Sequence, residues 1–354
     1  MKKMLCCLLA LLLLLSSLGG MTVLAISDED AVQEEEALPE VVGTRLSLTE
    51  NFLVRFYFRL PEGGHSPYAY VDGVIHEARE TEEPGLYEVI YEGLAVDAMV
   101  KQVKMIPVCR VEDKNLQGLP YYFSVRDYAM RLLVQDDLMP ELRRVLVAML
   151  NFGAAAQLYN QEQVYNLAND YLSAEDKIVP TREYNSVLAA HGKATQYFAT
   201  ITQASLVVND SACLKIYVNL EGQEQLRVNG GTGFPEWQHL SKDAEAARLA
   251  KDVWAEVADN PNFENASVFP LEKIKTMDCY RVVSSGIYAN RYSDSYYIRV
   301  CTPTGVSQTL QYGAETYVAR NLNASDMTEE GRKMVIAMIA YGDAVLAYEQ
   351  KQAA

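Results

Sequence analysis

The chain repeats one stretch of its own sequence, and this duplication limits its possible folds more than any other feature. The segments Phe123–Tyr159 and Tyr312–Tyr348 align without a gap. Aligned positions with the same residue include Tyr128 with Tyr317, Arg131 with Arg320, Asp137 with Asp326, Arg143 with Arg332, and Gly153 with Gly342. Such self-similarity indicates two diverged copies of one supersecondary unit, so both copies should fold in the same way.

Upstream segments also match, which extends each copy to the size of a domain. Leu46–Leu60 aligns with Leu206–Leu220, and the second copy carries an insertion at about 223–275. The predicted organisation is a first repeat unit at 41–172, a linker at 173–199 and a second repeat unit at 200–354.

Within each copy, strand patterns come first and helix patterns last. Phe52–Leu60 and Cys213–Leu220 alternate in the manner of half-buried strands, whereas Pro140–Tyr159 has apolar residues at helical spacing. A capping-box pattern at Ser124–Asp127 marks the start of a short preceding helix. The predicted class is α+β: two tandem diverged repeats, each an antiparallel β-sheet or sandwich followed by a helical hairpin. Lys242–Val257, inside the insertion, is predicted to form an extra helix.

Three positions that are identical in the two copies predict structural contacts. Gly153 and Gly342 lie on the apolar face of the long helix, where glycine costs about 1 kcal/mol relative to alanine. We expect each to allow a close crossing with the preceding short helix or with the sheet. Arg131 with Asp137, mirrored by Arg320 with Asp326, is predicted to form an ion pair that ties the helical hairpin together.

The first copy also resembles a recurrent module of secreted and surface proteins from anaerobic Gram-positive bacteria. The residues that carry the resemblance are Ser124–Ala129 (SVRDYA), Ala148–Gln157 (AMLNFGAAAQ) and Asn166–Asn169 (NLAN). The resemblance implies the fold and an extracellular location, but no activity and no catalytic residues. The second copy departs from the pattern, with Asp343 where the first copy has Ala154.

The N-terminus has the pattern of a cleavable export signal. Lys2 and Lys3 precede an apolar run over Met4–Leu18, and a small-residue exit ends at Ala25. We therefore predict a signal peptide at 1–25, an acidic disordered tether at 26–40, and a secreted, extracellular protein with wall association left open. A retained membrane anchor is the alternative, but the run is short for a span. After cleavage no membrane span is expected.

Charge and motif content argue against several functions. The chain has 47 acidic residues against 31 lysines and arginines, a formal net charge of −16, which disfavours nucleic acid as a partner. Its four histidines, His65, His76, His191 and His239, lack the paired spacing of a zinc site. No nucleophile elbow or phosphate-binding loop occurs in the sequence. We predict no metal and no cofactor.

Aromatic residues provide the candidate binding surface. The chain has 23 tyrosines and two tryptophans, and such amphipathic rings can stack on sugars or anchor a protein. The predicted binding residues are Tyr288, Tyr292, Tyr296, Trp237 and Trp254. The clusters Tyr68–Tyr70 and Tyr121–Tyr122 suggest the same role. The alternative is that these tyrosines are half-buried strand residues, because tyrosine favours strands.

Four cysteines remain after the predicted signal: Cys109, Cys213, Cys279 and Cys301. Export permits disulfides, and a bridge between Cys213 and Cys279 is the predicted pairing. Free buried thiols are the alternative.

The leading hypothesis from the sequence is a non-enzymatic extracellular module that binds a glycan or protein at the cell surface. One alternative is a hydrolase of extracellular polymer with carboxylates between the two units, since glycosidases need two carboxyl groups in one cleft. A purely structural spacer is the other.

Overall fold

The computed structural model describes most of the chain after the predicted signal and tether. The described residues are 37–48, 53–92, 94–184, 189–191, 199–208, 212–219, 253–274, 279–302, 305–322 and 324–354. They form a mixed α+β structure with four antiparallel sheets and four α-helices. None of the described helices is long and apolar enough to cross a bilayer. The predicted signal peptide, most of the tether and Trp237 lie outside the described residues.

Two compact units are present, and each is described separately. Unit 1 contains Met1–Arg45, Val54–Tyr91 and Val103–Phe123, and unit 2 contains Leu46–Leu53, Glu92–Gln102 and Ser124–Ala354. The helices that follow residue 123 therefore belong to unit 2, although most strands before them belong to unit 1. The reason is that the long helices of the two halves pack on each other within unit 2.

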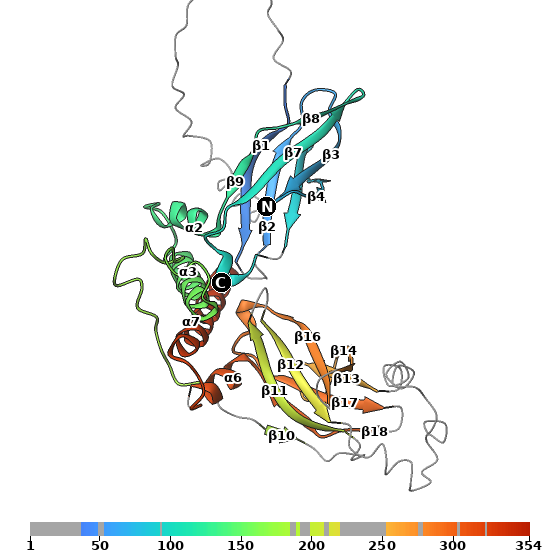
Figure 1. Cartoon of the computed structure of the whole chain (residues 1–354), viewed down its shortest axis with the longest axis vertical. Coiled ribbons are helices and arrows are strands. Elements are labelled where there is room, and N and C mark those ends of the chain that lie inside the picture. Colours follow the sequence, from blue (N-terminus) through green and yellow to red (C-terminus); the bar gives the residue numbers. More distant parts are fainter. Residues whose placement is uncertain are drawn as a thin grey trace, which may run out of the picture. The chain divides into compact units, whose positions relative to one another are not determined.

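Unit 1 is a β-sandwich (Figure 1). One sheet has the order β1 (Glu40–Ser47), β2 (Leu53–Arg59), β6 (Leu86–Tyr91), β5 (Arg79–Glu80). The other has the order β4 (Val74–Glu77), β3 (His65–Val71), β7 (Val103–Val111), β8 (Lys114–Gln117), with β9 (Tyr121–Phe123) also on β7. Phe56 joins the two layers, because its ring lies 5.9 Å from Phe123 and 6.3 Å from Tyr121, both edge-on.

Unit 2 contains the other two sheets. The first has the order β11 (Thr200–Val208), β12 (Ala212–Asn219), β16 (Tyr280–Ile287), β15 (Glu272–Lys273). The second has the order β10 (Ala189–His191), β19 (Thr309–Tyr312), β17 (Tyr296–Thr302), β13 (Trp254–Ala258), β14 (Ser267–Pro270), with β18 (Gly305–Val306) on β17. Alternate residues of β12 and β17 are fully buried, as in a sheet with one face on a core.

The helix predicted over Lys242–Val257 is wrong at its C-terminal end. Trp254–Ala258 forms strand β13, which pairs with both β14 and β17. Over so short a run, the apolar pattern that includes Ala255 and Val257 is compatible with either a helix or a strand. Hydrogen-bonded neighbours on both sides make it a strand. The rest of that segment, 242–252, lies outside the described residues.

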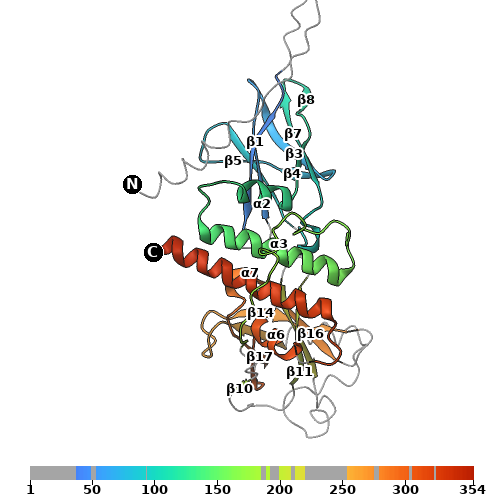
Figure 2. The same cartoon turned by 90° about the vertical axis from the view of Figure 1, so that its left-hand side faces the viewer.

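The helices of unit 2 are α2 (Val125–Leu133), α3 (Pro140–Asn160), α6 (Ala314–Asn321) and α7 (Glu329–Ala353), with short 3₁₀ turns η1 (Val96–Ala98) and η3 (Ala289–Arg291). Ser124 caps α2 as predicted, since its Oγ accepts a hydrogen bond from the Asp127 amide at 3.1 Å. Helices α3 and α7 lie side by side in opposite directions (Figure 2). Phe152 and Tyr341 stack at 6.1 Å between them, both near the middle of their helices.

Both helix glycines make the close contact that the sequence predicts, but with a different partner. A Cβ at Gly153 would lie 2.5 Å from Met99 Sδ, and one at Gly342 would lie 2.7 Å from the Ala289 carbonyl and 2.8 Å from Tyr292. The 3₁₀ turns η1 and η3, rather than the short helices, therefore pack against the glycines. A turn can approach a helix this closely only where no side chain intervenes.

The predicted Arg131–Asp137 and Arg320–Asp326 ion pairs are absent from the salt bridges of the described residues. A different arginine holds the α6–α7 turn. Arg332 donates to three carbonyls of the α6–α7 turn, including those of Ala324 at 2.9 Å and Met327 at 3.2 Å. Arg131 lies in the last turn of α2, where a positive charge is favourable at the negative end of the helix dipole.

Candidate functional site

The solvent side of the sheet β4–β3–β7 in unit 1 carries a row of aromatic and aliphatic side chains. Strand register sets Ile75 opposite Tyr70, and Tyr70 opposite Ile106. Tyr68 follows on the same face, because residues two apart in a strand point to the same side. The opposite face of β3 carries Ala69 and Val71, both fully buried in the sandwich.

Strand β9 extends this surface on the far side of β7. Tyr122 lies opposite Lys104, which shares the solvent face of β7 with Ile106. Its neighbours Tyr121 and Phe123 point the other way, into the sandwich, where both contact Phe56. We name the set Tyr68, Tyr70, Ile75, Ile106 and Tyr122 the tyrosine face.

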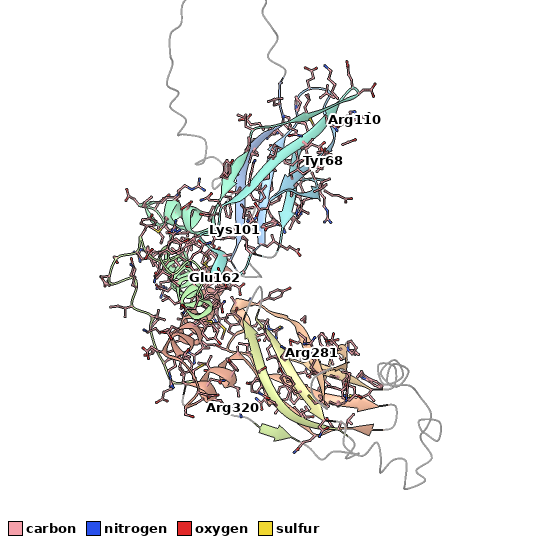
Figure 3. The ribbon with its side chains drawn as sticks, viewed as in Figure 1. Tyr68, Lys101, Arg110, Glu162, Arg281 and Arg320 are labelled. Carbon is pink, nitrogen blue, oxygen red and sulfur yellow. The ribbon has the colours of Figure 1, made fainter. Side chains whose placement is uncertain are left out.

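The two central tyrosines hold each other in place. Their ring centroids lie 5.6 Å apart at 75°, an edge-on arrangement that aromatic pairs prefer. Burial and a hydrogen bond with Tyr70 raise the pKa of Tyr68, so the Tyr68 phenol is neutral at physiological pH. Figure 3 labels Tyr68 on this sheet, with Arg110 near the end of β7.

The tyrosine face remains open to solvent at its edges. Ile75 is 62% exposed and Tyr122 is 59% exposed, while Tyr68, Tyr70 and Ile106 are half-buried. Exposed apolar side chains gathered on one face of a folded protein often mark a binding surface.

The tyrosines predicted from the sequence do not form one surface. Tyr292 is buried against Gly342, and burial raises its pKa well above the usual range, so it is a core residue and not a binding residue. Tyr296 is half-buried with the Arg291 guanidinium 5.5 Å from its ring centroid, and burial raises its pKa to about 12. Only Tyr288 is exposed.

Trp254 belongs to a charged cluster on the solvent face of β13 and β17. Its indole N–H donates to Glu256 at 3.2 Å, and Arg299 donates to the same carboxylate at 2.8 Å. Arg299 also lies 3.8 Å from the ring centroid of Phe263. Burial alone would raise the pKa of Glu256, but the hydrogen bonds from Arg299 and Trp254 lower it overall. The polar groups of Trp254, Glu256 and Arg299 therefore hydrogen-bond with one another.

The predicted Cys213–Cys279 bridge is not formed, and all four cysteines of the described residues are free thiols. Cys213 pairs with Gly286 at one end of β12, whereas Tyr280, next to Cys279, pairs with Val218 at the other end. About five strand residues, or roughly 17 Å, separate the two positions. A disulfide requires Cα atoms within about 7 Å, so this register excludes it.

Among the described residues, no group of three or more histidine, cysteine, aspartate or glutamate side chains is placed to hold a metal ion. His76 instead lies edge-on to Tyr91 at 5.8 Å, and His65 lies beside the Ser66 hydroxyl at 3.0 Å. Cys301 is buried beside Glu256, and both effects raise its pKa to about 12, so its thiol is protonated and unreactive.

Comparisons with known proteins assign no role to this surface. No protein-family model matches the chain, and no curated protein is significantly similar to it. The site therefore rests on its own geometry. The sequence predicts binding tyrosines around 288–296 rather than on β3, although the alternation of Tyr68 and Tyr70 with Ala69 indicates that both rings share one face of a strand.

Proposed function

We propose that this protein is a secreted, non-enzymatic binding module that recognises a glycan through the tyrosine face. The observation that carries the proposal is the row Ile75–Tyr70–Ile106 with Tyr68 and Tyr122 on a solvent-facing sheet. A regular antiparallel sheet holds its side chains in fixed positions, so the rings are preorganised and little entropy is lost on binding.

A sugar suits this surface better than an apolar partner does. Pyranose rings have apolar C–H faces that stack on aromatic rings, and hydroxyl groups that hydrogen-bond at the ring edge. The phenol groups of Tyr68 and Tyr70 supply both properties. Glu77, opposite Tyr68, and Gln117, opposite Val108, add polar groups at the two ends of the neighbouring cross-strand row, which contains Tyr68.

The proposal includes the internal duplication, secretion, and kinship with surface modules of anaerobic Gram-positive bacteria. The duplication is supported by the sheets β1-β2-β6-β5 and β11-β12-β16-β15, which have the same order of strand pairing. In each half a 3₁₀ turn also packs on the glycine of a long helix. Two such units in one chain suit attachment to a repetitive polymer.

The test is binding of the chain Ile26–Ala354 to insoluble cellulose, xylan and purified cell walls, with soluble hexasaccharides for affinity. Tyr68→Ala with Tyr70→Ala should weaken binding by about ten-fold, from the loss of two stacking surfaces. The matched control is Tyr57→Ala, a half-buried tyrosine on the solvent side of the other sheet of unit 1.

Equal loss in the Tyr57→Ala control would mean a general effect on the sandwich and would remove the support for the tyrosine face. Absence of binding to every polysaccharide by the unaltered chain would refute the proposal. Release of reducing ends during incubation would instead favour a hydrolase.

A further inference from the structure

The segment that follows α3 carries exposed aromatic residues although its backbone is firmly held. We call residues 161–184 the strap; Glu162, labelled in Figure 3, lies near its start. Within it Tyr165 is 87% exposed and Tyr171 is 66% exposed. A loop with such side chains usually carries function when a rigid scaffold positions it.

Side chains of α3 hold the strap by its backbone. Gln157, fully buried, donates to the Asn166 carbonyl at 3.0 Å and accepts from the Ala168 amide at 2.7 Å. Asn151 donates to the Asp176 carbonyl at 2.7 Å and accepts from Asn169 at 2.8 Å. Buried, fully satisfied amides of this kind fix one conformation.

Ion pairs secure the later part of the strap. Arg143 of α3 binds the Asp176 carboxylate through two hydrogen bonds of 2.9 and 2.8 Å, which lower the pKa of Asp176. Arg182 donates to Asp343 at 2.8 and 3.0 Å and also to Glu315. The strap is therefore anchored to α3 at one end and to α6 and α7 at the other.

Arg126 of α2 forms the base of a platform under Tyr171. Its side chain is buried, with the residue only 8% exposed, and it donates to Asn166 and, at 3.4 Å, to the Leu167 carbonyl. The guanidinium carbon lies 4.9 Å from the centroid of the Tyr171 ring. One face of the ring is thus covered by a fixed cation, and its exposure comes from the rest of the ring.

We propose that Tyr171, stacked on Arg126, is a second glycan-binding subsite, with Tyr165, the residue before the Asn166 that Arg126 binds, as a further aromatic contact. The proposal rests on the glycan-binding function proposed for the tyrosine face, but its residues all lie in unit 2. A pyranose ring would stack on the free face of Tyr171. Asp127, half-exposed and 3.7 Å from Arg126, supplies an acceptor for sugar hydroxyls. Arginine and carboxylate close to an exposed ring suit a polar ligand better than an apolar peptide.

The experiment titrates the chain Ile26–Ala354 with chitohexaose, cellohexaose and xylohexaose by calorimetry, in a background that carries Tyr68→Ala and Tyr70→Ala. Residual binding in this background should fall about three- to ten-fold with Tyr171→Ala, from the loss of one stacking contact. Tyr171→Phe keeps the ring and should bind nearly as the background does. Ile178→Ala, at another exposed strap residue, is the matched control and should have no effect.

Tyr165→Ala keeps the proposal testable if Tyr171→Ala loosens the strap, because so exposed a side chain contributes little to folding. It should also weaken the residual binding. Binding in the background that is unchanged by both variants would overturn the second subsite and leave the tyrosine face standing. Loss of all binding in the background alone would also overturn it, since one site would then account for recognition. No binding by the unaltered chain would overturn both.

Discussion

The sheet of β3 and β7 in unit 1 and the sheet of β13 and β17 in unit 2 have similar strand pairing but present opposite kinds of surface to solvent. Register places Trp254 of β13 and Tyr68 of β3 at corresponding points, and likewise Glu256 with Tyr70 and Arg299 with Ile106. On β13 and β17 the polar groups bind one another, whereas on β3 and β7 the rings and aliphatic groups face water. The backbone therefore fixes where the side chains lie, whereas hydrogen bonds among them decide whether they remain available to a ligand.

The edges of these sheets differ as well. Strand β10 pairs with the outer edge of β19, with His191 opposite Thr309. Strand β9 of unit 1, which pairs with β7 as β19 pairs with β17, has no outer neighbour within the described residues. Pro120 directly precedes β9. Proline lacks the N–H that an added strand would need, so it protects an open edge against aggregation.

The largest expected effect concerns the helix glycines. Gly342→Ala should lower the free energy of unfolding by about 2–3 kcal/mol, because its new Cβ would meet the rigid Ala289 carbonyl. Gly153→Ala should cost less, about 1–2 kcal/mol, because its nearest neighbour, Met99 Sδ, belongs to a flexible side chain, although the Ala168 Cβ at 3.1 Å leaves little room. Urea denaturation of both variants measures the difference. Equal costs would contradict the distinct packing of the two turns.

An intermediate effect is expected from the ion pair on β13 and β17. Arg299→Met should destabilise the protein by about 1–3 kcal/mol, because it leaves the half-buried Glu256 carboxylate without its charged donor. Ile106→Met, at the corresponding point of unit 1, should cost less than about 1.5 kcal/mol as a volume-conserving change. Thermal unfolding at neutral pH would compare them.

The same pair predicts a pH dependence. The pKa of Glu256 in the folded protein lies below its ordinary value of 4.5. Its contribution to stability is therefore fully present above about pH 4.5 and is lost as pH falls through the lower, folded-state pKa. Unfolding measured from pH 6 to pH 3 should show a smaller acid loss in Glu256→Gln than in the unaltered chain. Parallel curves would refute this role for the carboxylate.

The smallest effect on stability is expected at the edge of β9. Pro120→Thr should change the free energy of unfolding by no more than about 0.5 kcal/mol, as an exposed loop substitution does. It should nevertheless increase self-association at high concentration, because it restores an N–H donor to an open edge. Light scattering over a concentration series measures this. Leu119→Thr, at the adjacent exposed residue, serves as the control.

Much of the fold was predictable because local patterns and local structure coincide. The strands near 52–60 and 213–220, the cap at Ser124 and the long helix from Pro140 all appear. The glycines were recognised as points of close approach, but their partners were not, because η1 and η3 lie far from them in sequence and have no periodic signal. The helix expected up to Val257 failed for the complementary reason: both neighbours of β13 are supplied by other segments.

The binding surface divides in the same way. Sequence alone determined that tyrosine is abundant and that Tyr68 and Tyr70 share one face of any strand that contains both. Only the tertiary structure decided that Tyr292 is buried, that the side-chain amides of Asn151 and Gln157 hold the strap, and that Arg126 lies beneath Tyr171. Alternation along a strand is set by local backbone geometry, whereas exposure depends on which distant segments cover a side chain.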